Sequence, residues 1–342
     1  MDESFRVPAS LDCPHSFDPR YRQTALDRFD RFTPENEFKM AYLQPQRGIY
    51  DFRFADRIAG FAGVYGREIR GHALVWGAGL PAWLTSARLL DWGRDEALDV
   101  MRSHIRTVVR HFATRFPGVV TEWDVVNEPL RDDGRFAPNF WSLRIGKDYV
   151  EQALREARRA DPSVRLVINE VDVERPGPKA DALVGLVRDL KRRGAPLDAV
   201  GWQMHLGSPA GAPPVDDLVA MMRRYADLGV QVEITELDVP TPAVASTPGG
   251  DPAQEQADAY RRVATACRRA GNCSGLTVWG VADPYSWRGP DSQSCQFRPP
   301  EPVPQWKSLR PRMRSVEVWK SPDPLASTAA IQRRSASGIS AK

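Results

Sequence analysis

Residues 94–128 read RDEALDVMRSHIRTVVRHFATRFPGVVTEWDVVNE, and two patterns follow each other in this stretch. Residues 94–116 carry apolar side chains at positions i, i+3, i+4 and i+7, which is the period of an amphipathic helix. The run VVTEWDVVNE at residues 119–128 is short, apolar and rich in β-branched residues, so it predicts a strand. The stretch is therefore one helix followed by one strand.

The same two patterns recur along the whole chain. Six further apolar runs predict strands at residues 31–40, 67–76, 164–172, 198–206, 230–239 and 275–283. A short run at residues 4–10, SFRVPAS, is the candidate for an eighth strand although it contains Pro8. Alternating strands and helices predict a parallel sheet, and seven or eight units over about 300 residues indicate an α/β fold, a (β/α)8 TIM barrel. We expect the barrel to span residues 1–310 and residues 311–342 to form a disordered tail.

The bulk composition limits the partners. The 342 residues carry a formal net charge of only +3, so we expect neither nucleic acid nor a membrane as a partner. Separately, we expect a monomer. No apolar stretch approaches the roughly 18 residues of a transmembrane helix. The N-terminal residues lack the basic and apolar segments of a signal peptide. The protein is therefore intracellular or the given start lies downstream of the true one, and its location stays unknown.

Polar and aromatic side chains cluster where the predicted strands end. These residues are Glu35, Asn36, Lys39, His72, Trp76, Asn127, Glu128, Asn169, Glu170, Gln203, His205, Glu236, Asp238, Trp279, Asp283 and Trp287. In a TIM barrel the carboxyl ends of the strands build the active site. Any one of these residues, taken alone, is more often a satisfied core residue than a site residue. Convergent clusters at the ends of seven strands are hard to explain in that way, so they predict a site.

The composition of this ring favours a sugar as the ligand. Carboxylates, amides and imidazoles bind hydroxyl groups, and tryptophans cover the apolar faces of pyranose rings. The ring lacks a basic cluster for phosphate, and the chain lacks the Gly-x-Ser-x-Gly motif of serine esterases and the HExxH motif of zinc proteases. We expect no cofactor and no metal. A metal held by His72, His205 and a carboxylate is the minor alternative.

The four cysteines are Cys13, Cys267, Cys273 and Cys295. No two of them form a CxxC pair, which argues against a structural zinc site. Cys267 and Cys273 are close enough in sequence for a small-loop disulfide, and in a cytosolic protein both would be buried thiols. The sequence leaves this choice open.

Six segments of the chain resemble glycoside hydrolase family 10, the endo-β-1,4-xylanases. They are TPENEFK at 33–39, GHALVW with LPAW at 71–83, WDVVNEP at 123–129, WQMHL at 202–206, ITELDV at 234–239 and TVWGVADPYSW at 277–287. The resemblance covers about residues 20–310 in the order and spacing of the family, and WDVVNEP together with ITELDV is highly specific. It implies a retaining β-glycosidase that hydrolyses β-1,4-linked xylan or a related β-glycoside by double displacement.

The resemblance also implies a role for each matching residue. Glu128 resembles the general acid/base, and Glu236 resembles the nucleophile that His205 and Asp238 orient. Asn127 resembles the residue that bonds the sugar 2-hydroxyl. The other substrate-binding residues implied are Glu35, Asn36, Lys39, His72, Trp76, Gln203, Trp279 and Trp287. Cys267 and Cys273 match a pair that many members oxidise to a disulfide.

Retaining hydrolysis agrees with the positions of the two glutamates. It needs two carboxyl groups about 5–5.5 Å apart, one protonated to assist the leaving group and one ionised to attack the anomeric carbon. The strands that end near Glu128 and Glu236 lie on opposite sides of a barrel mouth. The two side chains can therefore face each other across a sugar.

The chain departs from the family pattern beside this pair. In VWGAGLPAW, Gly77 and Gly79 stand where the family has a histidine and a glutamine that contacts the second glycone sugar. We expect the loss of the glutamine to remove a hydrogen bond of about 1 kcal/mol and to open space. Val171 replaces a tyrosine of the acceptor side, and the usual first strand is poorly represented. We therefore expect a divergent member that acts on another β-glycoside, or only weakly on xylan.

Two other functions stay open at this stage. The same carboxylates could serve a transglycosylase or a tailoring enzyme on a glycosylated small molecule. The barrel could also bind glycans without catalysis. Glu128 and Glu236 argue against the second of these, because binding alone needs no pair of facing carboxylates.

Overall fold

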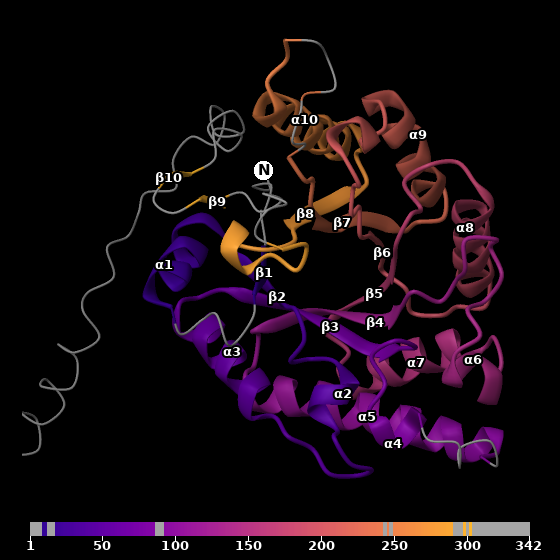
Figure 1. Cartoon of the computed structure of the whole chain (residues 1–342). Helices are drawn as coiled ribbons and strands as arrows, with labels where there is room; N and C mark the ends of the chain where they lie inside the picture. The colour runs from indigo at the N-terminus through magenta and orange to yellow at the C-terminus, as the bar shows by residue number, and fades with distance from the viewer. Residues whose placement is uncertain are drawn as a thin grey trace, which may run out of the picture. The chain divides into compact units, whose positions relative to one another are not determined.

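Eight parallel strands, each hydrogen-bonded to the next, close into a barrel in the order of the sequence (Figure 1). The computed structural model describes residues 9–11, 18–85, 92–241, 245 and 249–289, and the backbone of residues 297–298 and 301–302. The barrel closes where Ala9 of the first strand pairs with Val278 of the eighth. Its strands are β1 (Ala9–Leu11), β2 (Arg31–Pro34), β3 (Glu68–Trp76), β4 (Val120–Asn127), β5 (Arg165–Glu170), β6 (Ala199–Trp202), β7 (Gln231–Leu237) and β8 (Cys273–Val278).

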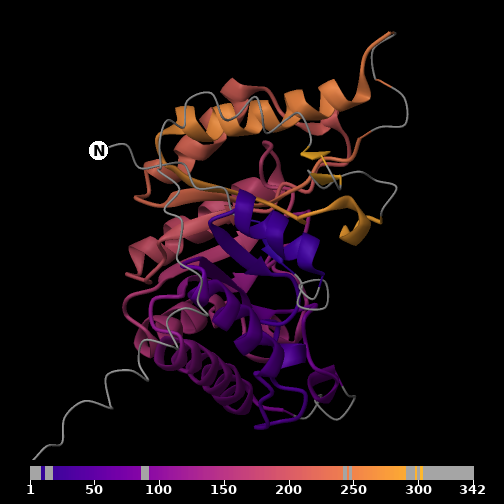
Figure 2. The ribbon, with the colours of Figure 1, turned by 90° about the vertical axis from the view of Figure 1, so that its left-hand side faces the viewer.

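Helices surround the barrel, and the long helices α5 and α10 cover opposite sides of it (Figures 1 and 2). The helices are α1 (Pro19–Arg28), α2 (Met40–Leu43), α3 (Arg53–Val64), α4 (Ala82–Thr85), α5 (Arg94–Arg115), α6 (Phe140–Arg144), α7 (Tyr149–Ala160), α8 (Pro178–Arg192), α9 (Val215–Ala226) and α10 (Pro252–Ala270). Two 3-10 turns, η3 (Pro209–Gly211) and η4 (Asp283–Tyr285), follow β6 and β8, and the short strands β9 (Phe297–Arg298) and β10 (Glu301–Pro302) pair with each other.

The apolar period of the sequence becomes the buried stripe of each helix. In α5 the side chains of Met101, Ile105 and Phe112 are fully buried, and each such burial stabilises the fold by about 1.5–3 kcal/mol. Capping fixes the ends of α10. Asp251 accepts a hydrogen bond of 3.0 Å from the amide of Ala253, and Gly271 ends the helix with a φ of 79°.

The predicted strands are present, but their bounds differ at the mouth of the barrel. The first strand begins at Ala9 and extends to Leu11, whereas the prediction was residues 4–10; residues 1–8 lie outside the described part. Strand β2 ends at Pro34, and β6 ends at Trp202. Apolar content alone could not show where the chain leaves the sheet, because the polar residues beyond each end turn into the mouth.

The inside of the barrel holds a charged network that the sequence analysis did not predict. Arg70 of β3 is fully buried and donates to Glu122 at 2.8 Å, to Glu233 at 2.6 Å and to Asp124 at 3.0 Å. Arg31 lies 2.7 Å from Glu122. A buried ion is costly unless its hydrogen bonds are satisfied, so removing one member of this network leaves the buried charges unbalanced.

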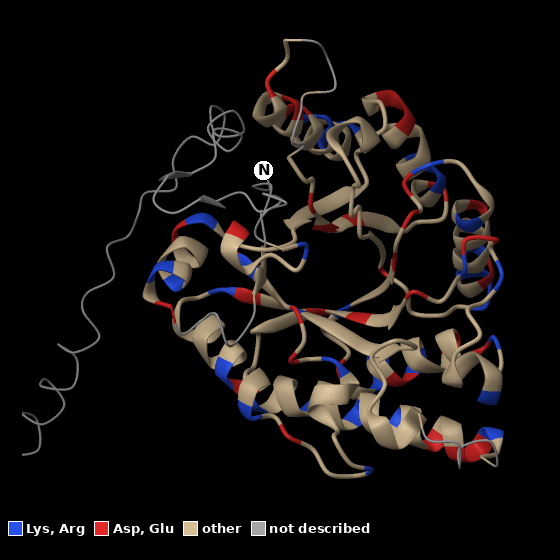
Figure 3. Cartoon of the chain, in the orientation of Figure 1, with Lys and Arg blue, Asp and Glu red and all other residues tan. Residues whose placement is uncertain are grey.

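Charges of both signs are interspersed over the surrounding helices (Figure 3). Among the described helices, none is long and apolar enough to cross a membrane. The predicted tail at residues 311–342 lies outside the described residues, so the tail and the domain boundary at 310 stay predictions.

Candidate active site

A cavity of about 450 Å³ lies at the carboxyl ends of the strands. Its walls include all twelve residues that were predicted to be catalytic or to bind substrate, together with Val171. The lining residues are Glu35, Asn36, Lys39, His72, Trp76, Asn127, Glu128, Val171, Gln203, His205, Glu236, Trp279 and Trp287.

Glu128 follows β4 directly and reaches into this cavity. Its backbone has a left-handed φ of 52°, and its amide donates to Asn169 O at 2.9 Å. Its carboxylate accepts two hydrogen bonds of 2.9 Å, from Trp76 Nε1 to Oε2 and from Gln203 Nε2 to Oε1. Both oxygens are therefore oriented by neighbours from other strands.

Glu236 of β7 faces the same cavity but is more deeply buried, with an exposed fraction of 4%. Asn169 Nδ2 donates to its Oε1 at 2.7 Å, and His205 Nε2 lies 3.0 Å from its Oε2. Burial opposes the ionisation of Glu236, but the imidazoles of His72 and His205 outweigh burial and hold the pKa of this carboxyl below its usual value. Glu236 is thus prepared to carry a negative charge.

His205 lies between two acidic side chains. Its Nε2 faces Glu236, and its Nδ1 lies 3.1 Å from Asp238 Oδ2. Burial disfavours the charged imidazole, yet Asp238 and Glu236 raise the pKa of His205 to about 10. Asp238 is fully buried and also accepts from Trp287 Nε1 at 2.7 Å and from Arg288 at 2.9 Å. Asp238 therefore holds His205 and the loop after η4 together.

His72 is held in a similar way on the other side of Glu236. Its Nδ1 lies 2.9 Å from Asp124 Oδ2 and 4.0 Å from Glu236 Oε1. Arg70 donates to the same Asp124, and this guanidinium together with His72 overcomes burial and lowers the pKa of the Asp124 carboxyl. The charged network of the barrel interior thus reaches the site through Asp124.

These contacts argue against a metal ion bound by His72 and His205. The Nδ1 atoms of His72 and His205 face Asp124 and Asp238, and the Nε2 atom of His205 is occupied by Glu236. Among the side chains that the structure describes, no group of three or more His, Cys, Asp or Glu residues could hold a metal ion.

The chain after β2 supplies the cationic part of the cavity. Lys39 Nζ donates to Asn36 Oδ1 at 3.0 Å and lies 4.9 Å from the ring centre of Trp76. Burial lowers the pKa of Lys39, although the surrounding carboxylates oppose this shift. Glu35 accepts a hydrogen bond of 2.8 Å from Ser10 of β1. Amines and carboxylates in this arrangement offer several donors and acceptors for hydroxyl groups.

Two tryptophans from the segment after β8 complete the cavity. Trp279 follows β8, is buried, and packs edge-on against His72 and His205 at ring distances of 5.6 and 6.1 Å. Trp287 is 56% exposed, and its ring lies 4.9 Å from that of His205. An exposed indole beside buried carboxylates is a surface on which a sugar ring can lie.

Asp124, Arg70 and Arg288 support the site and were missed by the sequence analysis, and no role was predicted for Asn169. None of Asn169, Asp124, Arg70 and Arg288 lines the cavity. Asn169 bonds to Glu236 and Asp124 bonds to His72, both of which line it, whereas Arg288 bonds to Asp238 behind it and Arg70 bonds to Asp124. Asn169 was predicted to belong to the ring of polar residues at the strand ends. The alternation of Glu122, Asp124 and Val126 along β4 is the signal that could have placed Asp124 inside the barrel.

Neighbouring side chains occupy the space beside Gly77 and Gly79. A Cβ atom at Gly79 would lie 2.8 Å from Cε3 of Trp76, and one at Gly77 would lie 2.6 Å from Cβ of Asn139. Open space was expected at Gly79. The Trp76 indole instead occupies the position where the Cβ atom of a larger residue would lie. The hydrogen-bonding group that a glutamine would bring is still absent.

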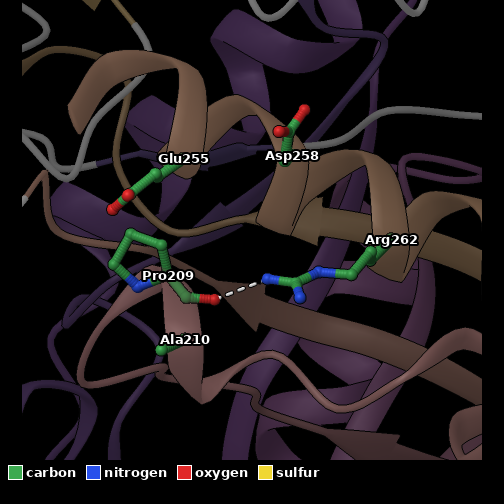
Figure 4. A pocket seen from close by; sticks show the side chains of 5 residues that line it. All are labelled: Pro209, Ala210, Glu255, Asp258 and Arg262. Carbon is green, nitrogen blue, oxygen red and sulfur yellow. Dashed lines mark hydrogen bonds between the residues drawn. The ribbon is translucent and has the colours of Figure 1, made fainter. Parts of the chain in front are cut away.

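Two further features lie away from the cavity. A hollow of about 410 Å³ between η3 and α10 is lined by Pro209, Ala210, Glu255, Asp258 and Arg262, and none of these was predicted to be a site residue (Figure 4). Arg262 donates to Pro209 O at 2.7 Å across it. Cys267 and Cys273 are joined by a disulfide that ties α10 to β8.

Comparison with known proteins gives the family. The sequence profile of glycosyl hydrolase family 10 matches residues 4–300. The chain belongs to this family. It is 34% identical over 268 residues to endo-1,4-beta-xylanase B of Thermotoga neapolitana, covering 78% of this chain and 74% of that one. It is 39% identical over 259 residues to endo-1,4-beta-xylanase C of Phanerodontia chrysosporium, covering 76% and 62%.

Solved structures of this family share the fold. Xylanase 10B of Thermotoga maritima matches with a TM-score of 0.81 and 30% identity, over 89% of this chain and 93% of that one. A variant of the intracellular xylanase of Thermoanaerobacterium saccharolyticum, solved with xylotetraose, matches with a TM-score of 0.77 and 31% identity, over 86% and 91%. The predicted family and (β/α)8 barrel are confirmed, and this glycosyl hydrolase family 10 member is a glycoside hydrolase of the endo-1,4-β-xylanase type.

Proposed function

We propose that Glu236 is the nucleophile and Glu128 the general acid/base of a retaining cleavage of β-1,4-linked xylan or a related β-glycoside. One observation carries this proposal: two glutamates face one cavity in different surroundings. Glu236 is buried among Asn169, His72 and His205, which favour its ionised form. Glu128 is more exposed, and within the described part of the chain the donors to its carboxylate are the neutral groups of Trp76 and Gln203.

The reaction proceeds in two displacements. Glu236 Oε attacks the anomeric carbon while Glu128 gives its proton to the departing glycosidic oxygen, so the C–O bond breaks and a glycosyl ester forms on Glu236. A water molecule then gives a proton to Glu128 and attacks the same carbon. The ester bond breaks, and both glutamates return to their starting states.

The histidines beside Glu236 act on its charge. In the free enzyme the charged His205 stabilises the carboxylate that must attack. When Glu236 becomes an ester it loses its negative charge, and His205 keeps Asp238 as its counter-ion at 3.1 Å. Asp238 therefore prevents an unpaired buried cation during the lifetime of the intermediate.

The cavity wall around Trp76 bears on the substrate class. Several solved relatives hold xylo-oligosaccharides, among them the xylotetraose complex. Gly77 and Gly79 offer no side-chain hydrogen bond to a sugar here, and their Cβ positions are taken by Asn139 and Trp76. We therefore propose that xylan-type chains are accepted with weaker binding on this side, and that a related β-glycoside is the better substrate.

The test uses aryl β-xylobiosides with the wild type and Glu236→Ala. We expect the variant to lose turnover and to regain it with azide, which takes the place of the missing carboxylate and yields an α-glycosyl azide. Asp258→Ala, in the hollow beside α10, is the matched carboxylate control and should keep full activity. An active Glu236→Ala variant, or an azide product of β configuration, would contradict the assignment.

A panel of β-glycans and aryl β-glycosides then tests the substrate class. Release of reducing sugar from xylan at a higher rate than from every other β-glycan would contradict the proposed preference. Products formed with an added sugar acceptor measure how much transfer accompanies hydrolysis.

A further inference from the structure

Glu170 is a buried carboxylate that ends β5 and does not line the cavity. Its Oε2 accepts from the amide of Leu130 at 3.0 Å, and its Oε1 accepts from the amide of Val171 at 3.0 Å. Lys179 Nζ lies 3.1 Å from the same Oε1. Both oxygens are thus engaged, and one of them holds the loop that follows β4.

The groups that Glu170 holds surround Glu128. Leu130 lies two residues after Glu128, and the amide of Glu128 itself bonds to the carbonyl of Asn169, the neighbour of Glu170. The main-chain carbonyl of Glu170 accepts from the amide of Gln203 at 3.0 Å. Gln203 in turn donates its side-chain amide to Glu128 Oε1 at 2.9 Å. Side chain and backbone of Glu170 therefore reach Glu128 by two routes.

The backbone in this region is strained. Three non-glycine residues in the described part of the chain have a left-handed φ: Glu128 at 52°, Asp172 at 55° and Met204 at 59°. Asp172 lies two residues after Glu170. Glu128 and Met204 lie within two residues of Leu130 and Gln203, whose amides donate hydrogen bonds to Glu170. Such conformations cost about 1–3 kcal/mol each and persist only where the surroundings fix them. The contacts of Glu170 are among those that do so.

Lys179 supplies the charge that makes this contact stable. It lies in the first turn of α8 and is 6% exposed. Burial alone raises the pKa of Glu170, and Lys179 with the two amides limits the rise to about 7. Asp132, on the surface 3.6 Å from Lys179, is a second and weaker partner of the cation.

We propose that Glu170, paired with Lys179, is a positioning residue for Glu128. It fixes the left-handed backbone from which Glu128 reaches the leaving-group oxygen, and it touches no substrate itself. This inference rests on the proposed role of Glu128 as the proton donor.

The test compares two substrates with the same glycone. The departure of phenolate from phenyl β-xylobioside is assisted by a proton, whereas 2,4-dinitrophenolate leaves without one. For Glu170→Ala we expect kcat/KM, which reports the first displacement, to fall about tenfold or more on the phenyl substrate. On the dinitrophenyl substrate it should stay within about twofold of the wild type, because a misplaced acid does not affect that step.

Two further variants separate positioning from stability. Glu170→Ala leaves the buried Lys179 with only the weaker of the two partners described here, Asp132, so the double variant E170L/K179M removes the acceptor and the cation together. We expect the same dependence on the leaving group in it. Asp198→Ala is the matched control. Asp198 also accepts hydrogen bonds from a backbone amide, that of Leu166, and from a cationic side chain, that of Arg158. It precedes β6 and therefore lies at the opposite rim of the barrel. It should show no such dependence.

The outcomes are distinct. Equal losses on both substrates, or no loss on either, in both Glu170→Ala and the double variant would overturn the positioning role. Glu128→Ala, measured on the same pair, reports on the proposed function separately. If Glu128→Ala shows no dependence on the leaving group, the assignment of the acid fails, whatever the Glu170 variants do.

Discussion

Asn169 donates a hydrogen bond of 2.7 Å to Glu236 Oε1 from a fully buried side chain behind the cavity. Thr235 Oγ1 donates to Asn169 Oδ1 at 2.7 Å, so the oxygen of the amide is occupied and its nitrogen must face the site. The same nitrogen lies 2.9 Å from Asn127 Oδ1. Because a donor stabilises an ionised carboxylate, Asn169 favours the form of Glu236 that attacks.

Asn169→Ala tests this relationship. The variant removes a charge-assisted hydrogen bond of about 1.5–3 kcal/mol from Glu236, so its pKa should rise. We expect the acid limb of the kcat/KM profile to move to higher pH, with a fall of about tenfold on that limb. The profile is measured on an aryl β-xylobioside. Asn272→Ala, at a half-buried amide before β8, is the control and should leave the limb in place.

The position of this site could be predicted from the sequence because a parallel barrel brings all strand ends to one mouth. Ten of the twelve predicted residues lie at or just beyond such an end, and no detail of packing is needed to gather these ten. His72 lies within β3, and Trp287 lies nine residues beyond β8. The charged interior could not be predicted in the same way. Arg70 meets Glu122 and Glu233 only through the relative register of β3, β4 and β7.

The space beside Gly77 and Gly79 is a second feature that could not be predicted from the sequence. Asn139 is 62 residues from Gly77, and it reaches Gly77 because it caps the start of α6, where its side chain bonds to Ser142. When only the sequence is known, a missing side chain suggests open space. Whether a neighbour takes that space depends on packing, which local pattern does not contain.

Gly79→Ala tests the packing of Trp76. The added Cβ would lie 2.8 Å from the indole of Trp76, so the ring must shift and its 2.9 Å hydrogen bond to Glu128 weakens. We expect kcat/KM on xylo-oligosaccharides to fall by roughly five- to tenfold, equal to about 1 kcal/mol. Gly207→Ala is the matched control, since no atom lies within 4 Å of its added Cβ. Equal activity of the two variants would show that Trp76 adapts without loss.

His205 predicts a loss of stability at alkaline pH. Its folded-state pKa of about 10 lies above the unfolded value near 6.5, so the stability from its pairing is fully present below about pH 6.5 and is lost as the pH rises to about 10. The slope is at most about 1.4 kcal/mol per pH unit. Urea unfolding of the wild type and His205→Asn across this range measures it. The variant should be less stable at neutral pH and show a flatter decline, and parallel curves would contradict the shift.

His104 predicts the opposite behaviour at acidic pH. It lies on the inner face of α5, is 1% exposed, and neither ring nitrogen has a hydrogen-bond partner within the described residues. Burial lowers the pKa of His104 to about 3. The unfolded chain takes up a proton near pH 6.5 and the folded one only near pH 3, so stability falls as the pH drops between these values.

His104→Leu should remove that contribution. A leucine leaves no unsatisfied nitrogen, so we expect a gain of about 1–3 kcal/mol at neutral pH and a larger gain as the pH falls. Urea unfolding from neutral to acidic pH measures the difference between variant and wild type, which cancels the titration of the carboxylates. His111→Gln, at a less buried histidine of the same helix that bonds to Asp56, is the control. A gain from His104→Leu that is independent of pH would mean that the folded protein accommodates the charged imidazole, because only a difference in proton binding between the folded and unfolded chains makes stability depend on pH.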